Sequence, residues 1–423
     1  MTPTMAATTT IEDARAQSSA GALGAAPVAG AVPVQTGKDT RGLLSLNDFD
    51  RAGRRFLPRM LYGFVAGGAE TEAALRGNQA SFGSCSLVPR VLVDTSGRSQ
   101  ATTLFGHRYA APFGIAPMGV TALCAYRGDL ALAQAAAAVN IPMVLSASSL
   151  IPLEQVWQAG ARWFQAYLPG DLPRIAALVD RVADAGFETL VLTVDIPVPA
   201  NRENNVRNGF SVPLEPTFRL AWDGITHPSW LFGTALRTVL RHGMPHFENM
   251  DAGRGPPILA RDVVRAVGPR DRLTWEHLAA IRRRWRGSLV VKGILSSSDA
   301  ALARNAGVDG IIVSNHGGRQ LDYAISPLRV LPAIVEQAKG VAVMIDGGVR
   351  RGTDVLKALA LGAEFVFVGR PFLFAAAIGG DTLVRHAAGL LSQEIDRDMA
   401  LMGVPDLASL ASQHIASSTV SLS

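Results

Sequence analysis

The chain has 423 residues, of which 48% are apolar, and this is enough for a large core in one or two domains. Its formal charge of +5 is modest for this length and gives no indication of nucleic-acid binding. With only two cysteines, Cys85 and Cys124, the composition excludes a disulfide scaffold and a cysteine-rich metal site, so we expect no metal and a reducing, cytoplasmic setting.

The N-terminal residues 1–44 are rich in Ala, Thr, Gly, Pro and Ser and show little periodicity, which predicts a disordered tail. They lack the basic start and compact apolar stretch of a signal peptide. A capping helical segment is predicted to begin near Asn47, in "LNDFDRAGRRFLP". No apolar run reaches the roughly 18–20 residues that cross a bilayer, so no spanning helix is predicted.

From residue 111 onward, short apolar runs alternate with stretches of helical periodicity. Such Val/Ile/Leu runs are typical of buried parallel strands. Eight βα units in about 260 residues predict an α/β fold, a (β/α)₈ TIM barrel, with an open doubly wound sheet as the alternative. The predicted strands are residues 113–118, 143–147, 163–167, 189–195, 289–293, 310–314, 342–346 and 365–369.

The interval after the fourth predicted strand is too long for one βα connection. It predicts an insertion over residues 203–274. Residues 224–247 contain no Asp or Glu, and Pro228 and Gly243 suit the start and stop of a helix. Apolar residues recur at helical spacing, with Thr234 and Arg237 toward the other face. The pattern predicts a membrane-contact helix; packing on the barrel or a neighbouring subunit is the alternative.

Several predicted strands end in polar side chains. One such residue alone indicates no more than a capped strand end. Because the carboxyl ends of barrel strands surround one mouth, five or more together indicate a functional site. The polar strand-end residues are Ser146, Gln165, Tyr167, Thr193, Asp195, Lys292, Ser314, His316 and Asp346.

Two glycine-containing segments follow the seventh and eighth predicted strands. They are "IDGGVRRGTD" (345–354) and "VFVGRP" (366–371). Exposed backbone N–H groups, a helix start and an arginine together favour a phosphate group. Each segment alone is a weak signal, but both in these places predict a phosphorylated cofactor or substrate.

The run "SNHGGRQLD" (314–322) resembles the signature of the FMN-dependent α-hydroxy-acid oxidase/dehydrogenase family. The resemblance covers roughly residues 45–415 and includes "FQAY", "TVDIPV", "VKG", "DGGVRRGTDV", "ALALGA" and "GRP". "THPSW…HGMP" in the insertion is similar to the segment of membrane-associated bacterial L-lactate and (S)-mandelate dehydrogenases. The resemblance implies one barrel domain over residues 45–415, FMN as the cofactor and a homotetramer.

The resemblance also implies roles for residues at the mouth. His316 is the base, and Asp195 orients it and stabilises its protonated form. Arg319 binds the substrate carboxylate, with Arg202 as a second cation nearby. Tyr167 hydrogen-bonds the substrate hydroxyl or the product carbonyl.

A further set of residues is expected to bind FMN, with Lys292 facing the N1 and C2=O side of the flavin. One departure concerns the substrate site, because Phe64 stands where the family usually has a tyrosine that contacts the substrate carboxylate. The expected FMN-binding residues are Pro117, Met118, Gly119, Ser146, Gln165, Thr193, Lys292, Ser314, Asp346, Gly347, Gly348, Val349, Arg350, Gly369 and Arg370.

These residues lead to a functional hypothesis. We expect FMN-dependent oxidation of a lactate- or mandelate-like (S)-2-hydroxy acid, with electrons passed to a membrane quinone and the protein held peripherally at the inner face of the cell membrane. The alternative acceptor is O₂, which would yield H₂O₂. Two other classes are an FMN-barrel isomerase or phosphate-ligand enzyme, and a non-enzymatic flavin-binding scaffold; the His316/Arg319 pair argues against both.

Overall fold

The computed structural model describes residues 40–211, 217–260 and 270–417. Positions 1–39 of the predicted tail lie outside these residues, as do positions 212–216 and 261–269 of the predicted insertion. Within the described ranges, no helix combines the length and apolar character needed to cross a bilayer.

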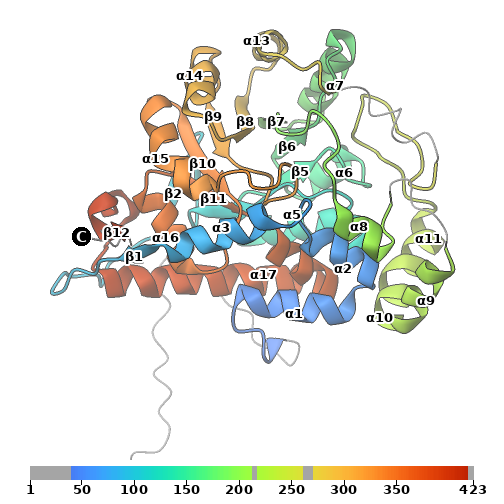
Figure 1. Cartoon of the computed structure of the whole chain (residues 1–423), viewed down its shortest axis with the longest axis horizontal. Coiled ribbons are helices and arrows are strands. Elements are labelled where there is room, and N and C mark those ends of the chain that lie inside the picture. Colours follow the sequence, from blue (N-terminus) through green and yellow to red (C-terminus); the bar gives the residue numbers. More distant parts are fainter. Residues whose placement is uncertain (1–39, 212–216, 261–269, 418–423) are drawn as a thin grey trace, which may run out of the picture.

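Eight parallel strands form a barrel at the centre of the molecule (Figure 1). Neighbours pair in the order β4-β11-β10-β9-β8-β7-β6-β5, and a parallel bridge between Ile115 and Met143 joins the first strand to the last. The predicted (β/α)₈ barrel is therefore confirmed. Its strands are β4 (Phe113–Ile115), β5 (Val144–Ser146), β6 (Trp163–Ala166), β7 (Thr189–Thr193), β8 (Ser288–Ile294), β9 (Gly310–Val313), β10 (Ala342–Asp346) and β11 (Phe365–Val368).

Large apolar side chains fill the barrel interior, among them Trp163, Phe365 and Phe367. A hairpin of β2 (Thr102–Leu104) and β3 (His107–Tyr109) adds Leu104 and Tyr109 to the same cluster. Because the hairpin directly precedes β4, it closes the end of the barrel where the strands begin. The carboxyl ends of the strands are left as the open mouth.

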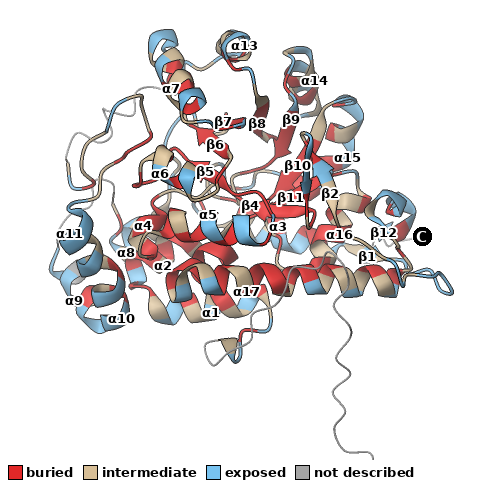
Figure 2. Ribbon diagram, turned by 180° about the vertical axis from the view of Figure 1, so that it is seen from behind, coloured by how far each residue is buried: buried red, intermediate tan, exposed pale blue. Residues whose placement is uncertain are grey.

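Helices surround the barrel, and each turns a buried face toward the strands (Figure 2). In α7, for example, Asp171 caps the N-terminus by accepting from Arg174 N, and the buried residues lie at helical spacing. The surrounding helices are α4 (Thr121–Cys124), α5 (Gly128–Ala138), α6 (Leu153–Gln158), α7 (Leu172–Asp184), α13 (Trp275–Arg284), α14 (Ser297–Asn305), α15 (Pro327–Gln337), α16 (Gly352–Ala360) and α17 (Arg370–Met402).

Three helices precede the barrel: α1 (Leu46–Phe56), α2 (Arg59–Ala66) and α3 (Ala73–Gly83). The predicted helix start near Asn47 is confirmed, since Ser45 and Asp48 form a capping box at the N-terminus of α1. Helix α1 packs along α17 (Figure 1). Strands β1 (Cys85–Leu87) and β12 (Ile415–Ser417) pair antiparallel and join the two ends of the domain.

The insertion after β7 contains α8 (Glu203–Asn208), α9 (Phe218–Thr226), α10 (Pro228–Trp230), the π-helix η2 (Leu231–Leu236) and α11 (Arg237–His242). The predicted helical run from Pro228 to Gly243 is present, and Gly243 has a φ of 74°.

Two polar residues of this run lie toward the barrel. Thr234 is buried, and the Arg237 guanidinium lies 3.8 Å from the ring centroid of Tyr126. Apolar residues of the same run, among them Phe232 and Leu240, are exposed instead.

An exposed group of large apolar side chains covers the outside of the insertion. Phe218 is 86% exposed and Leu240 is 82% exposed. A group of exposed large apolar side chains on one segment indicates contact with a membrane or another protein. We call this group the apolar insertion surface; its members are Phe218, Trp222, Ile225, Phe232, Leu236, Val239 and Leu240.

Candidate active site

A cavity of about 830 Å³ opens at the carboxyl ends of the barrel strands. The turn after β9 brings both His316 and Arg319 to its wall. In this turn His316, Gly317 and Gly318 have φ values of 58°, 65° and 74°. A Cβ atom on Gly318 would lie 2.4 Å from the backbone nitrogen of Leu75, so only glycine lets the turn pass this close to α3.

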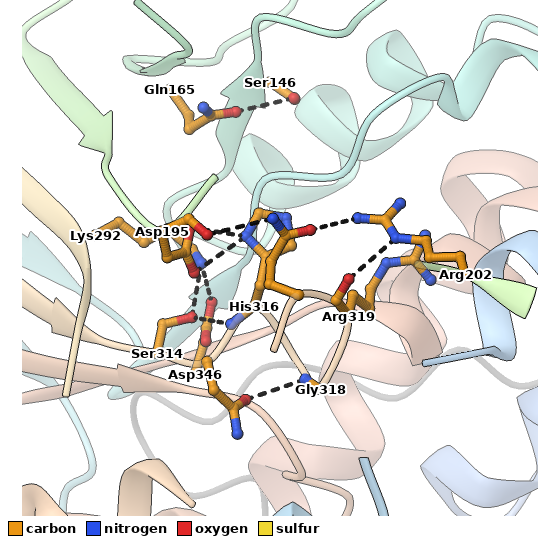
Figure 3. Close-up of polar contacts among 12 residues, drawn as sticks. Ser146, Gln165, Asp195, Arg202, Lys292, Ser314, His316, Gly318, Arg319 and Asp346 are labelled. Carbon is orange, nitrogen blue, oxygen red and sulfur yellow. Dashed lines mark hydrogen bonds and ion pairs between the residues drawn. The ribbon is translucent and has the colours of Figure 1, made fainter. Parts of the chain in front are cut away.

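His316 is held by a carboxylate. Its Nδ1 lies 3.1 Å from Oδ1 of Asp195 (Figure 3). Burial lowers the pKa of His316, although Asp195 opposes the shift. Burial alone would raise the pKa of Asp195, but its interaction with His316, which includes a hydrogen bond, lowers it, so Asp195 is a carboxylate. With Nδ1–H donated to Asp195, the neutral ring keeps its lone pair on Nε2, where it can accept a proton.

This lowered pKa gives a prediction for the pH dependence of turnover. A base must be unprotonated to act, so we expect kcat/KM to be constant around pH 7 and to fall as the pH drops through a pKa below 6.5. The measurement is a kcat/KM profile from pH 5 to 9 with a substrate that dissociates from the enzyme faster than it reacts. A rise that begins only above pH 7 would contradict a neutral His316.

Two arginines meet beside the base (Figure 3). Arg319 donates from Nη1 to the carbonyl oxygens of Phe64 and Gly67, at 2.6 and 3.0 Å. Arg202 donates from Nε to the Arg319 carbonyl oxygen at 3.0 Å. Burial and the neighbouring charge of Arg202 hold the pKa of Arg319 well below its usual value, and an anionic ligand would relieve both effects.

Phe64 lies against this pair of arginines. Its ring centroid is 4.9 Å from Cζ of Arg319, and it stacks on Phe210 with a centroid separation of 4.3 Å. The residue that departs from the family pattern therefore faces the expected carboxylate site. Phe64 and Phe210 make this wall apolar.

We expect Phe64→Tyr to tighten binding of lactate. A hydrogen bond to a charged group contributes roughly 1.5–3 kcal/mol when its geometry is good. The measurement is the Kd of lactate or an unreactive analogue by calorimetry, with Phe210→Tyr as the matched control. An unchanged Kd would mean that a hydroxyl at position 64 does not reach the ligand.

A buried ion pair forms part of the cavity wall. Nζ of Lys292 is 2.9 Å from Oδ2 of Asp346 and 2.8 Å from Oγ of Ser314. Burial lowers the pKa of Lys292, but Asp346 and Asp195 more than offset it, so the net shift is upward. Lys292 therefore presents a permanent positive charge at the barrel mouth.

Buried polar atoms without partners cluster at the ends of neighbouring strands. Among the described residues, nothing hydrogen-bonds to Nε2 of Gln165, Oγ1 of Thr193 or Oδ1 of Asp346. Ser146 already donates to the other amide atom of Gln165, at 3.0 Å. Unpaired buried polar atoms are costly, and a heteroaromatic ring with donors and acceptors along one edge would satisfy them. The flavin of FMN fits this requirement.

The loop after β10 has the geometry of a phosphate cradle. Gly347 and Gly348 have φ values of 98° and 89°. A Cβ on Gly348 would lie 2.5 Å from the Asn78 carbonyl oxygen, so this position can hold only glycine. Arg350 and Arg370 line the same cavity, and α16 and α17 begin there. These features fit the phosphate end of FMN.

Arg350→Ala is expected to weaken FMN binding about 10- to 100-fold, because a charge-assisted contact to phosphate is lost. The measurement is the Kd from titration of the apoprotein with FMN, followed by flavin fluorescence. The matched control is Arg351→Ala, since Arg351 pairs with Glu394 and does not line the cavity. If both variants bind FMN as firmly as the parent, Arg350 does not contact the phosphate.

The structure brings all the predicted site residues into one region. Ser146, Gln165, Thr193, Ser314 and Asp195 lie at or just beyond strand ends, below or beside the cavity. The other predicted residues line it: Phe64, Pro117, Met118, Gly119, Tyr167, Arg202, Lys292, His316, Arg319, Asp346, Gly347, Gly348, Val349, Arg350, Gly369 and Arg370.

Sequence reasoning missed three supporting residues. Asn78 and Asn315 exchange two amide hydrogen bonds of 2.7 Å beside the Gly347 loop. Asp322, the last residue of the signature, accepts from Thr71 N and Ala74 N. Burial alone would raise the pKa of Asp322, but these hydrogen bonds lower it to about 2. The signature thus also fixes the N-terminal helices over the mouth.

Comparison with known proteins agrees with this geometry. A family model described as FMN-dependent dehydrogenase matches residues 53–417. The L-lactate dehydrogenase of Pectobacterium atrosepticum is 38% identical over 87% of this chain and 95% of its own. The (S)-mandelate dehydrogenase of Pseudomonas putida is 37% identical over 89% and 94%. A crystal structure of monotopic membrane protein (S)-mandelate dehydrogenase superposes with a TM-score of 0.83 at 37% identity, over 89% of this chain and 100% of that one.

Proposed function

This chain belongs to the FMN-dependent dehydrogenase family, and from that premise we propose that it oxidises an (S)-2-hydroxy acid to the 2-oxo acid. The observation that carries the proposal is the position of His316, held by Asp195, beside Arg319 in the cavity that fits FMN. The relatives named for lactate and mandelate indicate the substrate class. Formation of the 2-oxo acid from (S)- but not (R)-lactate or mandelate tests it.

The side chains have distinct roles in this reaction. Arg319 and Arg202 bind the substrate carboxylate, which places the hydroxyl near Tyr167 and His316. The two rings lie together, with centroids 6.5 Å apart. Nε2 of His316 takes the hydroxyl proton, and Asp195 stabilises the imidazolium that forms. FMN held by the residues described above would supply the acceptor for the two electrons of the Cα–H bond.

The acceptor of the electrons is the second part of the proposal. Helix α9 contacts α2, which contributes Phe64 and Val65 to the cavity wall. The part of the apolar insertion surface that lies on α9 is therefore close to the cavity wall. We assign it to a membrane interface, where a long-chain quinone can approach the cavity.

The alternative acceptor is O₂. Stoichiometric H₂O₂ during turnover in air would support the oxidase reaction, whereas substrate oxidation that depends on added quinone supports the dehydrogenase. The relative described as a monotopic membrane protein favours the membrane-bound form. The inner face of the cell membrane and a homotetramer remain predictions.

A further inference from the structure

One arginine in the cavity has no role so far. Arg270 lines the wall near Tyr167, and its Cζ lies 4.6 Å from the centroid of that ring. Its Nε is fully buried, and no hydrogen bond or ion pair joins the guanidinium to another described residue. Burial lowers the pKa of Arg270, and among the described residues no carboxylate pairs with it to offset this effect.

The other cations of the cavity each have partners. Arg202, Arg319, Arg350 and Arg370 all donate to carbonyl or side-chain oxygens, and Lys292 pairs with Asp346. The second carboxylate that lines the cavity, Asp271, is exposed and has no ion pair within the described ranges. Leaving a cation partly buried and unpaired costs free energy. We therefore expect the ligand to carry a hydrogen-bond acceptor for the Arg270 guanidinium.

Arg270 contacts a different part of the cavity wall from the two arginines of the carboxylate site. Arg319 donates to the carbonyl oxygens of Phe64 and Gly67, and Arg202 donates to Gln320. The guanidinium of Arg270 lies over the ring of Tyr167. A substrate held by Arg319 and Arg202, with its hydroxyl at Tyr167, would therefore meet Arg270 with another part of the molecule.

The loop fixes Arg270 in this position. A Cβ built on Gly170 would lie 2.5 Å from Cβ of Arg272, so the loops after β6 and before α13 pack closely. Leu273 N donates to the Arg270 carbonyl oxygen at 3.1 Å. The lining of the same cavity includes the apolar side chains of Phe247 and Met250. This arrangement suits a substituent with an apolar stem and a charged end.

We propose that Arg270 is a specificity residue that binds a second carboxylate at the far end of the substrate, so that the preferred substrate is a 2-hydroxy diacid. This inference rests on the proposed oxidation of 2-hydroxy acids and names the substrate class. The apolar stem packs along Phe247 and Met250, and the terminal carboxylate supplies a counter-ion for Arg270.

The test compares a diacid with an uncharged substrate of the same shape. Suitable pairs are (S)-2-hydroxyglutarate with (S)-2-hydroxy-5-methylhexanoate, and (S)-4-carboxymandelate with (S)-4-isopropylmandelate. We expect kcat/KM to favour the diacid in at least one pair. Arg270→Gln should lower that preference about 10- to 100-fold, and Arg270→Lys should restore part of it. Arg272→Gln, an exposed neighbour on the same loop, should leave the preference unchanged.

Binding provides a second readout that does not depend on turnover. The Kd of 2-oxoglutarate, measured by calorimetry, should rise in Arg270→Gln more than that of 5-methyl-2-oxohexanoate. A parent enzyme that prefers the uncharged member of both pairs overturns the inference. Equal losses for diacid and uncharged substrate in Arg270→Gln also overturn it, and they would indicate an effect through Tyr167. If no 2-hydroxy acid of either kind is oxidised, the proposed function itself fails.

Discussion

Replacing His316 with Gln is expected to slow reduction of bound FMN by the best substrate by a factor of about 10² to 10⁴, the usual contribution of one general base. Gln retains an amide that can reach Asp195 but has no basic lone pair, so the hydroxyl proton has no acceptor. The measurement is single-turnover flavin reduction by anaerobic stopped flow.

The control for this variant is His107→Gln. His107 lies on β3 at the closed end of the barrel, where it pairs with Glu188. It should reduce FMN at the parent rate. Near-parental reduction in His316→Gln, with FMN bound stoichiometrically, would remove His316 from the role of base.

The second large effect is expected from the apolar insertion surface. Trp222, Phe232 and Leu240 are each more than half exposed, and none lines the cavity. Burial of one such side chain contributes about 1.5–3 kcal/mol, so changing all three to Ser should weaken binding to vesicles on the order of 10³-fold or more. Cosedimentation with vesicles of anionic lipid measures this, and reduction of a long-chain quinone in the vesicles should fall in parallel.

A matched control uses exposed leucines elsewhere on the surface. The triple change of Leu172, Leu302 and Leu401 to Ser removes apolar area outside the insertion and should leave vesicle binding unchanged. If the insertion variant still binds vesicles and reduces the quinone as the parent does, the membrane assignment is wrong. A change in oligomeric state instead would assign the surface to a subunit interface.

The barrel was predictable because each strand is a continuous apolar run and the chain repeats the βα unit. The catalytic turn was predictable because the base His316, the two glycines and the cation Arg319 follow one another in the sequence. Their positions at strand ends then follow from the fold, since parallel strands bring their carboxyl ends to one mouth.

The parts of the site that could not be predicted depend on contacts between residues far apart in the sequence. Nothing local to Arg270 indicates that its guanidinium lies over Tyr167, about a hundred residues earlier. The pairing of Asn78 with Asn315 likewise joins two segments that share no pattern.

The insertion also could be predicted only in part. The spacing of its apolar residues predicted a helix, but nothing in the sequence predicted the π-helical turn that contains the buried Thr234. The cavity wall also includes Phe247 and Met250, which belong to the same insertion. Removing the whole insertion would therefore damage the active site, and point substitutions on its outer face are the sharper test.

The most direct test of the central claim is anaerobic titration of the FMN-bound protein with paired (S)- and (R)-2-hydroxy acids, including lactate, mandelate and 2-hydroxyglutarate. The loss of flavin absorbance near 450 nm is followed, and the 2-oxo acid formed is measured. The account predicts that at least one (S)-acid bleaches the flavin and yields one 2-oxo acid per FMN, while its (R)-enantiomer does not. Flavin that stays oxidised with every acid of the panel would contradict it.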